Sequence, residues 1–405
     1  MEDKQGERFE VEVTTYRKEE DYYGGRWPGK VEFSTALEED LARRDFTVNA
    51  MAIDFADLFD ASATTDEVIV DPFGGNADLA ARIIRSVRDP LERLSEDGLR
   101  SYKACRLAAE LGFEIEPRTF EAITETLHVA DQISRERIRD ELNKLLLHSP
   151  KPSTGIDLMR RSGLLGLFMP ELLETIGVTQ PEWHEDDVYT HSLKTLDLAP
   201  DSVRLAALLH DIGKPSTRSE DETGIHFYSH DVAGAAIAKE IMTRLRYSSR
   251  EITRVSELIR WHMFYYPSAD WRKEHGMEKL QDSDGGWTDS AVRRFIQRVG
   301  EDLLEDLFKL RIADATANPK SSFDPSEIRE LEKRISQVRS QELVLKISDL
   351  SISGEDLKQM GISPGPVMGN ILNRILDMVI EEPILNERDT LLKIASEMSR
   401  DMKTE

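Results

Sequence analysis

Alternating apolar and polar positions, the pattern of a half-buried strand, occur only in the first 88 residues of the chain. FEVEVTTY at residues 9–16 alternates and is rich in Val, Thr and aromatic residues, so it predicts a strand. RWPGKVEFS (26–34) predicts a loop that leads into a short strand. LEEDLARRDFTVNAMAIDF (37–55) predicts a helix and then a strand, and EVIVDPFGGNADLAARIIRSV (67–87) predicts strand, Gly-rich turn, helix and strand.

From residue 89 onward nearly every segment has helical periodicity, and we expect no further strands. The best breaks between helices are HSPKPS (148–153), VTQPEW (178–183), residues 264–288 and ANPKSSFDPSE (317–327). SPGPVMG (363–369) is a Pro/Gly turn of the type that opens a helix. The pattern predicts an α+β fold with its β-structure at the front.

Composition narrows the class of protein. A length of 405 residues suggests two to four domains, and 39% hydrophobic residues are enough for real cores. No apolar run approaches the roughly 20 residues of a membrane helix, and MEDKQGERFE has no apolar segment of a signal peptide. One cysteine, Cys105, excludes a disulfide framework, and its helical apolar surroundings indicate a buried small hydrophobe. We expect a cytoplasmic protein.

The net charge of −24 by itself argues against a nucleic-acid partner, because phosphate contacts need Lys and Arg. Global charge decides little, however, since binding depends on the local field. Clustered arginines could form a basic track on an acidic body. An acidic proteome, as in salt-adapted organisms, explains the charge equally well.

Two segments near the front have side chains suited to a nucleotide. In ARRDFTVNAMA (42–52), the side chains of Arg44, Asp45 and Asn49 could hold a triphosphate and a ribose. The alternative is a surface turn with ordinary salt bridges. DPFGGNADL (71–79) places two glycines before a helix, which makes a phosphate-tolerant turn, and a purely structural turn is at least as good an interpretation.

Two helical segments carry ordered charges. In SEDGLRSYKACRLAAELGF (95–113), the charged residues Asp97, Arg100, Lys103 and Arg106 recur every three positions along one face. A carboxylate beside a guanidinium can match the edge of a base, although a solvated charge ladder is the alternative. In SRERIRDELNKLL (134–146), Ser134 is the predicted N-cap, and three arginines, Arg135, Arg137 and Arg139, oppose the helix dipole unless they face phosphate.

Six of the nine histidines fall between residues 184 and 262, and one of them forms the pair His210-Asp211 at the end of an apolar helical run. His191 precedes the pair, and His226, His230, His262 and Asp314 follow it. Imidazole and carboxylate ligands together suit Zn, Mn, Fe, Ni or Co better than Ca or Mg. A buried structural histidine explains any one of these residues but not the ordered series.

RRDFTVNA, DPFGGNADL, the EDxxR of Glu96, Asp97 and Arg100, and SRERIRDEL occur in an order that resembles the class II tRNA nucleotidyltransferases (CCA-adding enzymes) and bacterial poly(A) polymerases. The resemblance covers essentially the whole chain and implies tRNA, CTP and ATP as partners. It implies that Asp97 and Arg100 read the incoming base, with Lys103 and Arg106 on the same helix. It places Arg44, Asp45 and Asn49 near the sugar and phosphates, and Arg135, Arg137 and Arg139 on RNA. Gly98 and Lys103 depart from the family's common proline and arginine.

A larger departure is at the front of the chain. The family opens with Gly-Gly-x-Val-Arg-Asp and an Asp-x-Asp pair that holds two Mg²⁺ ions for nucleotidyl transfer, and neither motif occurs here. Glu12 would be the one remaining carboxylate, which cannot build a two-metal clamp alone. We expect an N-terminally truncated record of a complete enzyme. The alternative is a chain that no longer adds nucleotides.

The histidine series resembles the HD phosphohydrolases, an all-helical superfamily with the ligand pattern H…HD…D. The resemblance implies His191, His210, Asp211 and Asp314 as core ligands, with His230 and His262 available to a second metal. Lys214 would contact a phosphate oxygen, and His184 and His226 would be surface or substrate-contacting residues. The implied chemistry is hydrolysis of a phosphoester by metal-activated water, with 2′,3′-cyclic and 2′-phosphate ends as substrates.

The resemblance predicts four regions: a partial polymerase-beta-like α/β head (1–88), a helical neck and body that binds nucleotide and tRNA (89–180), an all-α HD domain (181–320) and a helical C-terminal region (321–405). The main hypothesis is a tRNA-maturing nucleotidyltransferase. One alternative is a metal phosphohydrolase whose head is an RNA-binding scaffold, and another is a non-catalytic tRNA-binding protein. Whether the chain forms a homodimer is left open.

Overall fold

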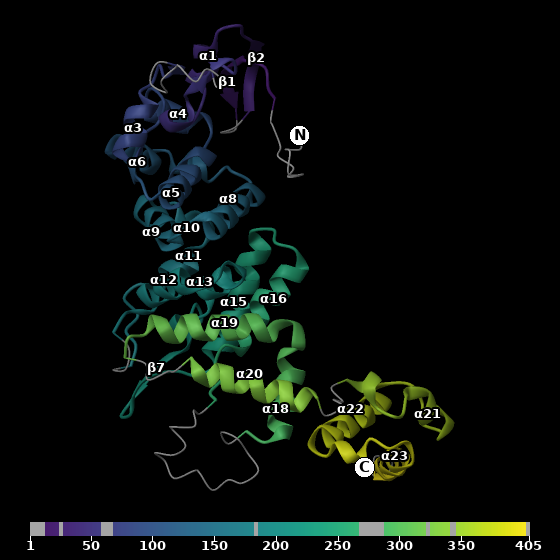
Figure 1. Cartoon of the computed structure of the whole chain (residues 1–405). Coiled ribbons are helices and arrows are strands. Elements are labelled where there is room, and N and C mark those ends of the chain that lie inside the picture. Colours follow the sequence, from purple (N-terminus) through teal and green to yellow (C-terminus); the bar gives the residue numbers. More distant parts are fainter. Residues whose placement is uncertain are drawn as a thin grey trace. The chain divides into compact units, whose positions relative to one another are not determined.

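The computed structural model describes residues 13–23, 27–57, 68–181, 185–266, 287–320, 325–340 and 346–401 (Figure 1). The backbone forms two compact units. One contains the described residues up to Val255 except Glu185, and the other contains Glu185 and the described residues from Ser256 onward. The boundary after Val255 falls inside the predicted region 181–320, so the division into four regions stays a prediction.

The first unit opens with paired short strands. β1 (Arg17–Tyr23) pairs antiparallel with β2 (Trp27–Phe33), and β3 (Ala52–Ile53) pairs antiparallel with β4 (Ile69–Val70). Helix α1 (Leu37–Ala42) and a 3-10 turn (Thr47–Asn49) lie between the two pairs, and α3 (Gly75–Ala81) and β5 (Ile83–Ile84) follow them. The predicted order of elements in residues 37–87 is confirmed, whereas β1 was not predicted.

Two predictions about strands are wrong. Residues 13–16 of the predicted strand at 9–16 are not a strand, and residues 9–12 lie outside the described residues. β6 (Glu114–Ile115) pairs in parallel with β5, and β7 (Arg218–Asp221) forms a hairpin with β8 (Gly224–Phe227), so β-structure does not end near residue 88. β6 is too short to show alternation, and β7 is exposed and polar throughout, so neither carries the apolar pattern that predicts a strand.

Helices build the rest of the first unit. In chain order they are α4 (Pro90–Glu96), α5 (Leu99–Leu111), α6 (Pro117–Glu125), α7 (Leu127–Ala130), α8 (Arg135–His148), α9 (Pro152–Ser162), α10 (Leu165–Phe168), α11 (Pro170–Leu173), α12 (Val188–Leu198), α13 (Arg204–Leu209), α14 (Lys214–Thr217) and α15 (His230–Arg244), with a 3-10 turn at Asp201–Val203.

Helix α5 packs against both α8 and α9, and its buried face carries Tyr102, whose ring meets that of Phe168 edge-on with centroids 5.9 Å apart. Cys105 lies on this buried face, as predicted, and burial raises the pKa of its thiol to about 12. Gly98 precedes α5 where a Cβ atom would lie 2.6 Å from the carbonyl oxygen of Val129. Glycine at this position is explained by the close approach of the two backbones.

The second unit is helical where it is described. Helix α16 (Ser249–Trp261) runs into it from the first unit, followed by α18 (Asp289–Val299), α19 (Glu301–Ala317), α20 (Ser326–Arg339), α21 (Gly354–Gln359), α22 (Pro366–Glu381) and α23 (Arg388–Asp401), with 3-10 turns at Ile347–Asp349 and Pro383–Leu385. Pro366 is the first residue of α22, as the Pro/Gly turn predicted.

The buried face of α22 forms the core of the C-terminal helices together with residues of α21 and α23, including Leu357 and Leu391. Short two-stranded sheets and many helices confirm the α+β class. Within the described parts of the chain, no helix is long and apolar enough to cross a membrane.

Candidate functional site

The two segments with predicted nucleotide-binding side chains lie against each other. Lys103, on α5, places its Nζ 3.4 Å from Oδ2 of Asp45, and the Nη2 of Arg100 donates to the carbonyl oxygen of Arg43 at 3.1 Å. Asp45 also accepts a hydrogen bond from Nδ2 of Asn49 at 3.2 Å. Residues 58 positions apart in sequence are thereby brought into one polar cluster.

Asp45 is held in its charged form. Burial alone would raise its pKa, but the ammonium of Lys103 and the hydrogen bonds from Asn49 and from the backbone of Phe46 outweigh burial and lower the pKa below the usual value of 3.8. Arg44, the neighbour of Asp45, donates to the carbonyl oxygen of Asn49 at 3.3 Å and is partly exposed. A fixed carboxylate beside an accessible guanidinium can bind the hydroxyls and phosphates of a nucleotide.

Arg100 is buried, with 7% of its surface exposed, and its side chain is held by residues of the preceding helix, α4. Its Nη1 donates to Oε2 of Glu96 and to the carbonyl oxygen of Arg93, both at 2.7 Å. Asp97 instead pairs with Arg137, whose Nη2 lies 3.3 Å from Oδ2. The two residues predicted to read a base thus have separate side-chain partners, and that role stays a prediction.

Arg106 faces a different helix. Its Nε donates to Oε2 of Glu141 on α8 at 2.7 Å, and its Nη1 donates to Oε2 of Glu110 at 2.6 Å. The side chain of Glu141 is 3% exposed, so this ion pair joins α5 to α8 in a buried position. Its geometry is that of a structural contact, and a role for Arg106 in nucleotide binding stays a prediction.

The three arginines at the start of α8 all have acceptors in the structure. Arg135 donates to the carbonyl oxygen of Leu167 at 2.9 Å, and Arg137 pairs with Asp97 as described. Arg139 pairs with Asp140 and lies over the ring of Tyr247, 5.9 Å from its centroid. Ser134 is the N-cap residue by position, without a capping hydrogen bond from its side chain. RNA binding by these arginines stays a prediction.

The glycine turn before α3 is occupied by a side chain of the protein. Asp71 accepts hydrogen bonds from the backbone N–H groups of Gly75 and Asn76 at 2.7 and 2.8 Å. These are the groups that a phosphate at this helix terminus would need. A Cβ atom on Gly75 would lie 2.2 Å from the carbonyl oxygen of Thr47, so glycine is required for close packing. The geometry favours the structural interpretation of DPFGGNADL.

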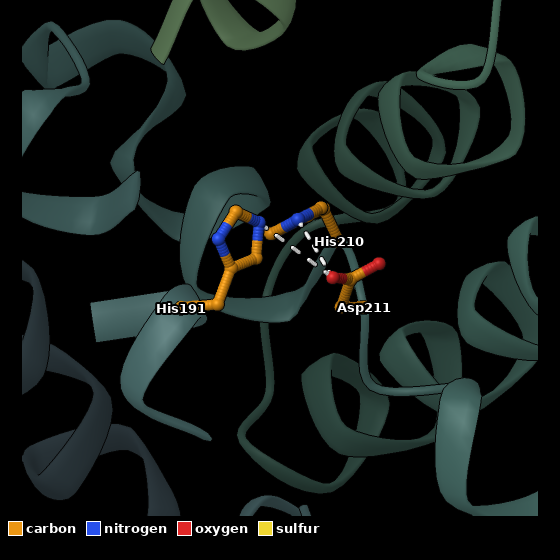
Figure 2. Close-up of side chains that lie close together, drawn as sticks. All are labelled: His191, His210 and Asp211. Atoms are coloured by element: carbon orange, nitrogen blue, oxygen red, sulfur yellow. Dashed lines mark ion pairs between the residues drawn. The ribbon is translucent and has the colours of Figure 1, made fainter. Parts of the chain in front are cut away.

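His191, His210 and Asp211 form a separate cluster of buried side chains of the kinds that bind metals (Figure 2). His191 comes from α12, and His210 and Asp211 directly follow α13. Nε2 of His210 lies 3.1 Å and Nε2 of His191 lies 3.8 Å from Oδ2 of Asp211. One ligand atom from each residue lies within 4.8 Å of the others, and all three residues are buried. This donor set fits a divalent transition metal.

Backbone carbonyls orient two of the imidazoles. Nδ1 of His210 lies 2.8 Å from the carbonyl oxygen of Ala207, and Nδ1 of His230 lies 2.8 Å from that of Phe227. A carbonyl oxygen only accepts, so each Nδ1 carries a proton and Nε2 is the ring nitrogen that can face a metal. Nε2 of His230 lies 3.5 Å from Oδ1 of Asp211. His230, predicted as a ligand of a second metal, therefore lies beside Asp211.

The carboxylate of Asp211 is the group that the three imidazoles and Lys214 all approach. Lys214 Nζ donates to its Oδ2 at 2.7 Å and to Oε1 of Gln180 at 2.7 Å, and it lies over the ring of Phe227. Burial alone would raise the pKa of Asp211, but His210 and Lys214 outweigh burial and hold the pKa well below its usual value. Sequence reasoning did not find Gln180, which lies 34 residues from its partner and belongs to no motif. Lys214 is 8% exposed, and its contact with phosphate stays a prediction.

Five predicted site residues remain. His262 and Asp314 belong to the second unit, where Nδ1 of His262 donates to the carbonyl oxygen of Ile259 and Asp314 pairs with Arg311; their role as ligands stays a prediction. His226, on β8, pairs with Asp221. Glu12 and His184 lie outside the described residues.

Three family models match the chain in succession. The model described as "Poly A polymerase head domain" matches residues 2–85, and "Probable RNA and SrmB- binding site of polymerase A" matches residues 112–175. The model described as "HD domain" matches residues 185–318, which include the buried cluster.

Two similar proteins are named for their activity on tRNA. The chain is 34% identical over 368 residues to the A-adding tRNA nucleotidyltransferase of Deinococcus radiodurans, a match that covers 84% of this chain and 75% of that protein. It is 34% identical over 360 residues to the CC-adding tRNA nucleotidyltransferase of Thermus thermophilus, covering 85% and 74%. The crystal structure of the Bacillus stearothermophilus CCA-adding enzyme in complex with CTP has the same fold, with a TM-score of 0.60, 21% identity, and coverage of 97% and 80%.

Proposed function

The chain belongs to the family of tRNA nucleotidyltransferases and poly(A) polymerases, and from this premise we propose that its head and neck bind a nucleoside triphosphate and the 3′ end of a tRNA. The observation that carries the proposal is the contact of Lys103 with Asp45 and of Arg100 with the backbone of Arg43. This contact joins the predicted ribose and phosphate residues to the predicted base-reading helix. CTP and ATP are the proposed nucleotides.

The residues present do not fit the two Mg²⁺ ions of nucleotidyl transfer. The printed sequence has no Asp-x-Asp pair in residues 1–85. Among the described residues of the head, 13–23, 27–57 and 68–85, no group of three His, Cys, Asp or Glu side chains could hold a metal ion. We therefore assign binding of nucleotide and RNA to these residues and derive no transfer step through Mg²⁺.

An incorporation assay with a tRNA that lacks its 3′ end tests this assignment. The chain as printed should bind CTP and ATP and incorporate little of either. A version extended upstream with the family's Gly-Gly-x-Val-Arg-Asp and Asp-x-Asp should add nucleotides. Incorporation of C, A or both by the extended version identifies its specificity.

Binding itself needs a matched control. Lys103→Ala removes a cation that faces Asp45, whereas Lys239→Ala removes an exposed lysine of α15 remote from this cluster in sequence. We expect Lys103→Ala to weaken CTP and ATP binding about tenfold, in line with the loss of one charge-assisted hydrogen bond, and Lys239→Ala to leave binding unchanged. Equal affinities for the two variants would contradict the proposed nucleotide site.

We also propose that the buried cluster is the centre of a metal-dependent phosphohydrolase, with His191, His210, Asp211 and His230 as ligands. The observation that favours this second activity is the geometry of four ligand side chains, buried together, with two imidazoles oriented by carbonyl oxygens. Ni, Mn, Co, Fe or Zn is the proposed metal, and RNA ends with 2′,3′-cyclic or 2′-phosphate groups are the proposed substrates. His262 and Asp314 are proposed as further ligands.

A divalent metal bound there would polarise a phosphoester and lower the pKa of a bound water. The protein's own contribution is to engage Nδ1 of His210 and His230 with carbonyl oxygens, which leaves Nε2 of each ring to face a metal. Asp211 stays charged because Lys214 and His210 stabilise the carboxylate. Lys214 also restricts the carboxylate to one orientation through Gln180.

Turnover of bis-p-nitrophenyl phosphate with added Ni²⁺, Mn²⁺ or Co²⁺ tests the phosphohydrolase. Asp211→Ala should abolish turnover, and the exposed Asp221→Ala serves as the control because Asp221 lies on the β7–β8 hairpin. Undiminished turnover in Asp211→Ala would show that the assignment of the metal ligands is wrong. Binding of tRNA without any phosphoester hydrolysis would favour a non-catalytic tRNA-binding protein.

A further inference from the structure

A second-unit pocket lined by aromatic rings lies outside both sites described above. Its walls come from the residues that follow α16 and from α18, and its volume is about 290 Å³. Trp261, Phe264, Tyr265, Trp287 and Phe295 contribute rings to it. This volume is at the lower end of small-molecule sites, about 300–1,000 Å³, so it suits one planar group rather than a long chain.

The rings of the pocket are held in place by one another. The centroids of Trp287 and Phe295 are 5.0 Å apart with the planes at 68°, and those of Phe264 and Phe295 are 5.2 Å apart. Trp261 donates from Nε1 to Oε2 of Glu257 at 2.8 Å, which fixes the indole. Tyr265 is 52% exposed and forms part of the accessible wall. Fixed, partly exposed rings are surfaces on which a flat ligand can stack at little entropic cost.

Cations surround this aromatic wall although the whole chain carries a net charge of −24. The guanidinium of Arg260 lies over the ring of Trp261, 5.1 Å from its centroid. Arg294 and Arg298, one turn apart on α18, also line the pocket. Arg294 pairs with Glu381 of α22.

Arg298 differs from its neighbour on α18. It is exposed, and it forms no hydrogen bond or ion pair with any residue that the structure describes. Its guanidinium lines both the aromatic pocket and an adjoining cavity of about 400 Å³ between α18 and α22. An available guanidinium at the edge of a set of aromatic rings is suited to a phosphate attached to a stacked group.

We propose that this pocket binds a nucleobase by stacking on its aromatic wall, with the attached phosphate on Arg298. The base and its phosphate can come from a free mononucleotide or from single-stranded RNA, since both present the same chemistry. This site is separate from the nucleotide cluster of the neck and from the buried metal ligands. It gives the protein a second place at which to hold one nucleotide unit.

Photo-cross-linking of the full chain with 8-azido-AMP and with 8-azidoadenosine, followed by peptide mapping, tests the site directly. We expect label within residues 261–265 or 287–298 and at least about fivefold more label from the AMP probe than from the nucleoside. Tyr265→Ala should reduce labelling about tenfold, which corresponds to the loss of one base stack, and Tyr265→Phe should restore it. Circular dichroism checks that the variants are folded.

Arginine variants test the phosphate contact. Arg298→Ala should remove the preference for AMP over adenosine, whereas Arg374→Ala, an exposed arginine of α22 outside the pocket, should keep it. Unlabelled AMP that competes as well as a short single-stranded RNA identifies a mononucleotide site, and stronger competition by RNA identifies an RNA site. The head and neck site can also take up the probe, so label there is compatible with the proposal. No label within residues 261–265 or 287–298, no effect of Tyr265→Ala on label in these peptides, or competition there by an aromatic peptide but not by AMP would overturn it. Because the readout is the labelled peptide, it is independent of nucleotidyl transfer and of phosphoester hydrolysis.

Discussion

Replacing Asp211 by Asn separates the metal-binding role of this carboxylate from its structural role. In the structure, its Oδ2 lies 2.7 Å from Nζ of Lys214, and the two side chains are 3% and 10% exposed. Removing one partner of a buried ion pair costs about 3–5 kcal/mol, because the remaining charge stays buried without compensation. Gln180 still accepts from Lys214 at 2.7 Å, so we expect the lower end of this range, about 3 kcal/mol.

Native-state hydrogen exchange of α12, α13 and α15, measured in EDTA, provides the local free energy of opening without assuming that the whole chain unfolds in one step. Asp211→Asn should lose about 3 kcal/mol of protection in these helices. The double variant Asp211→Asn/Lys214→Met should recover most of that loss, because it removes the orphaned ammonium.

Calorimetric titration with Mn²⁺, Ni²⁺ or Co²⁺ measures the second role. The wild-type protein should bind the metal and gain about 2.7 kcal/mol of protection at a metal concentration one hundred times Kd. Both Asp211 variants should lose this gain. Wild-type metal affinity in Asp211→Asn would refute the ligand assignment, and a double variant no better protected than the single one would refute the pairing of Asp211 with Lys214.

Three further predictions concern the head and neck. Gly75→Ala should lower the free energy of unfolding of the head by about 1–3 kcal/mol in urea, because the new Cβ atom would meet the carbonyl oxygen of Thr47. Gly369→Ala is the control: it lies in open space within α22 and should stabilise that helix by up to about 1 kcal/mol. Equal effects of the two substitutions would contradict the packing explanation. Arg106→Met should lower the free energy of unfolding in urea by about 3 kcal/mol, because it leaves the charge of Glu141 buried without this partner. Lys144→Met removes an exposed partner of the same carboxylate and should cost less than about 1 kcal/mol. Similar losses of stability would show that the buried pair contributes no more than the exposed one. Because the pKa of Asp45 is lowered in the folded protein, its stabilising interactions are fully present above about pH 4 and are lost as the pH falls through the folded-state pKa. In urea titrations, the stability advantage of wild type over Asp45→Asn should therefore shrink below about pH 4. An advantage that is unchanged at about pH 3 would contradict this prediction.

Local patterns were sufficient where the relevant spacing is short. The adjacency of His210 and Asp211 and the three-residue step from Asp211 to Lys214 already place these groups on one turn, and the structure pairs them. The predicted order of helices and strands in residues 37–87 is confirmed for the same reason, because turn residues and periodicity act over a few positions. Family motifs then supplied the class of enzyme.

Other pairings depend on segments that are distant in sequence. Strands β5 and β6 pair in parallel, so a helical connection must bring the chain back to the same end of the sheet. β6 has only two residues, which is too short for a sequence pattern that predicts a strand. The EDxxR spacing suggested that Asp97 and Arg100 act together, but Arg100 takes its partner four residues back at Glu96, while Asp97 finds Arg137 on another helix.

Spacing and residue type were thus enough to determine the α+β class, the family, and which residues are candidates for metal and nucleotide. They could not determine which acceptor each arginine uses, that Asp71 fills the glycine turn, or that Gln180 supports Lys214. Which groups pair depends on the distances between helices, and packing of the whole unit sets these distances. A charged side chain has several possible partners in sequence, and burial decides which of them it can reach.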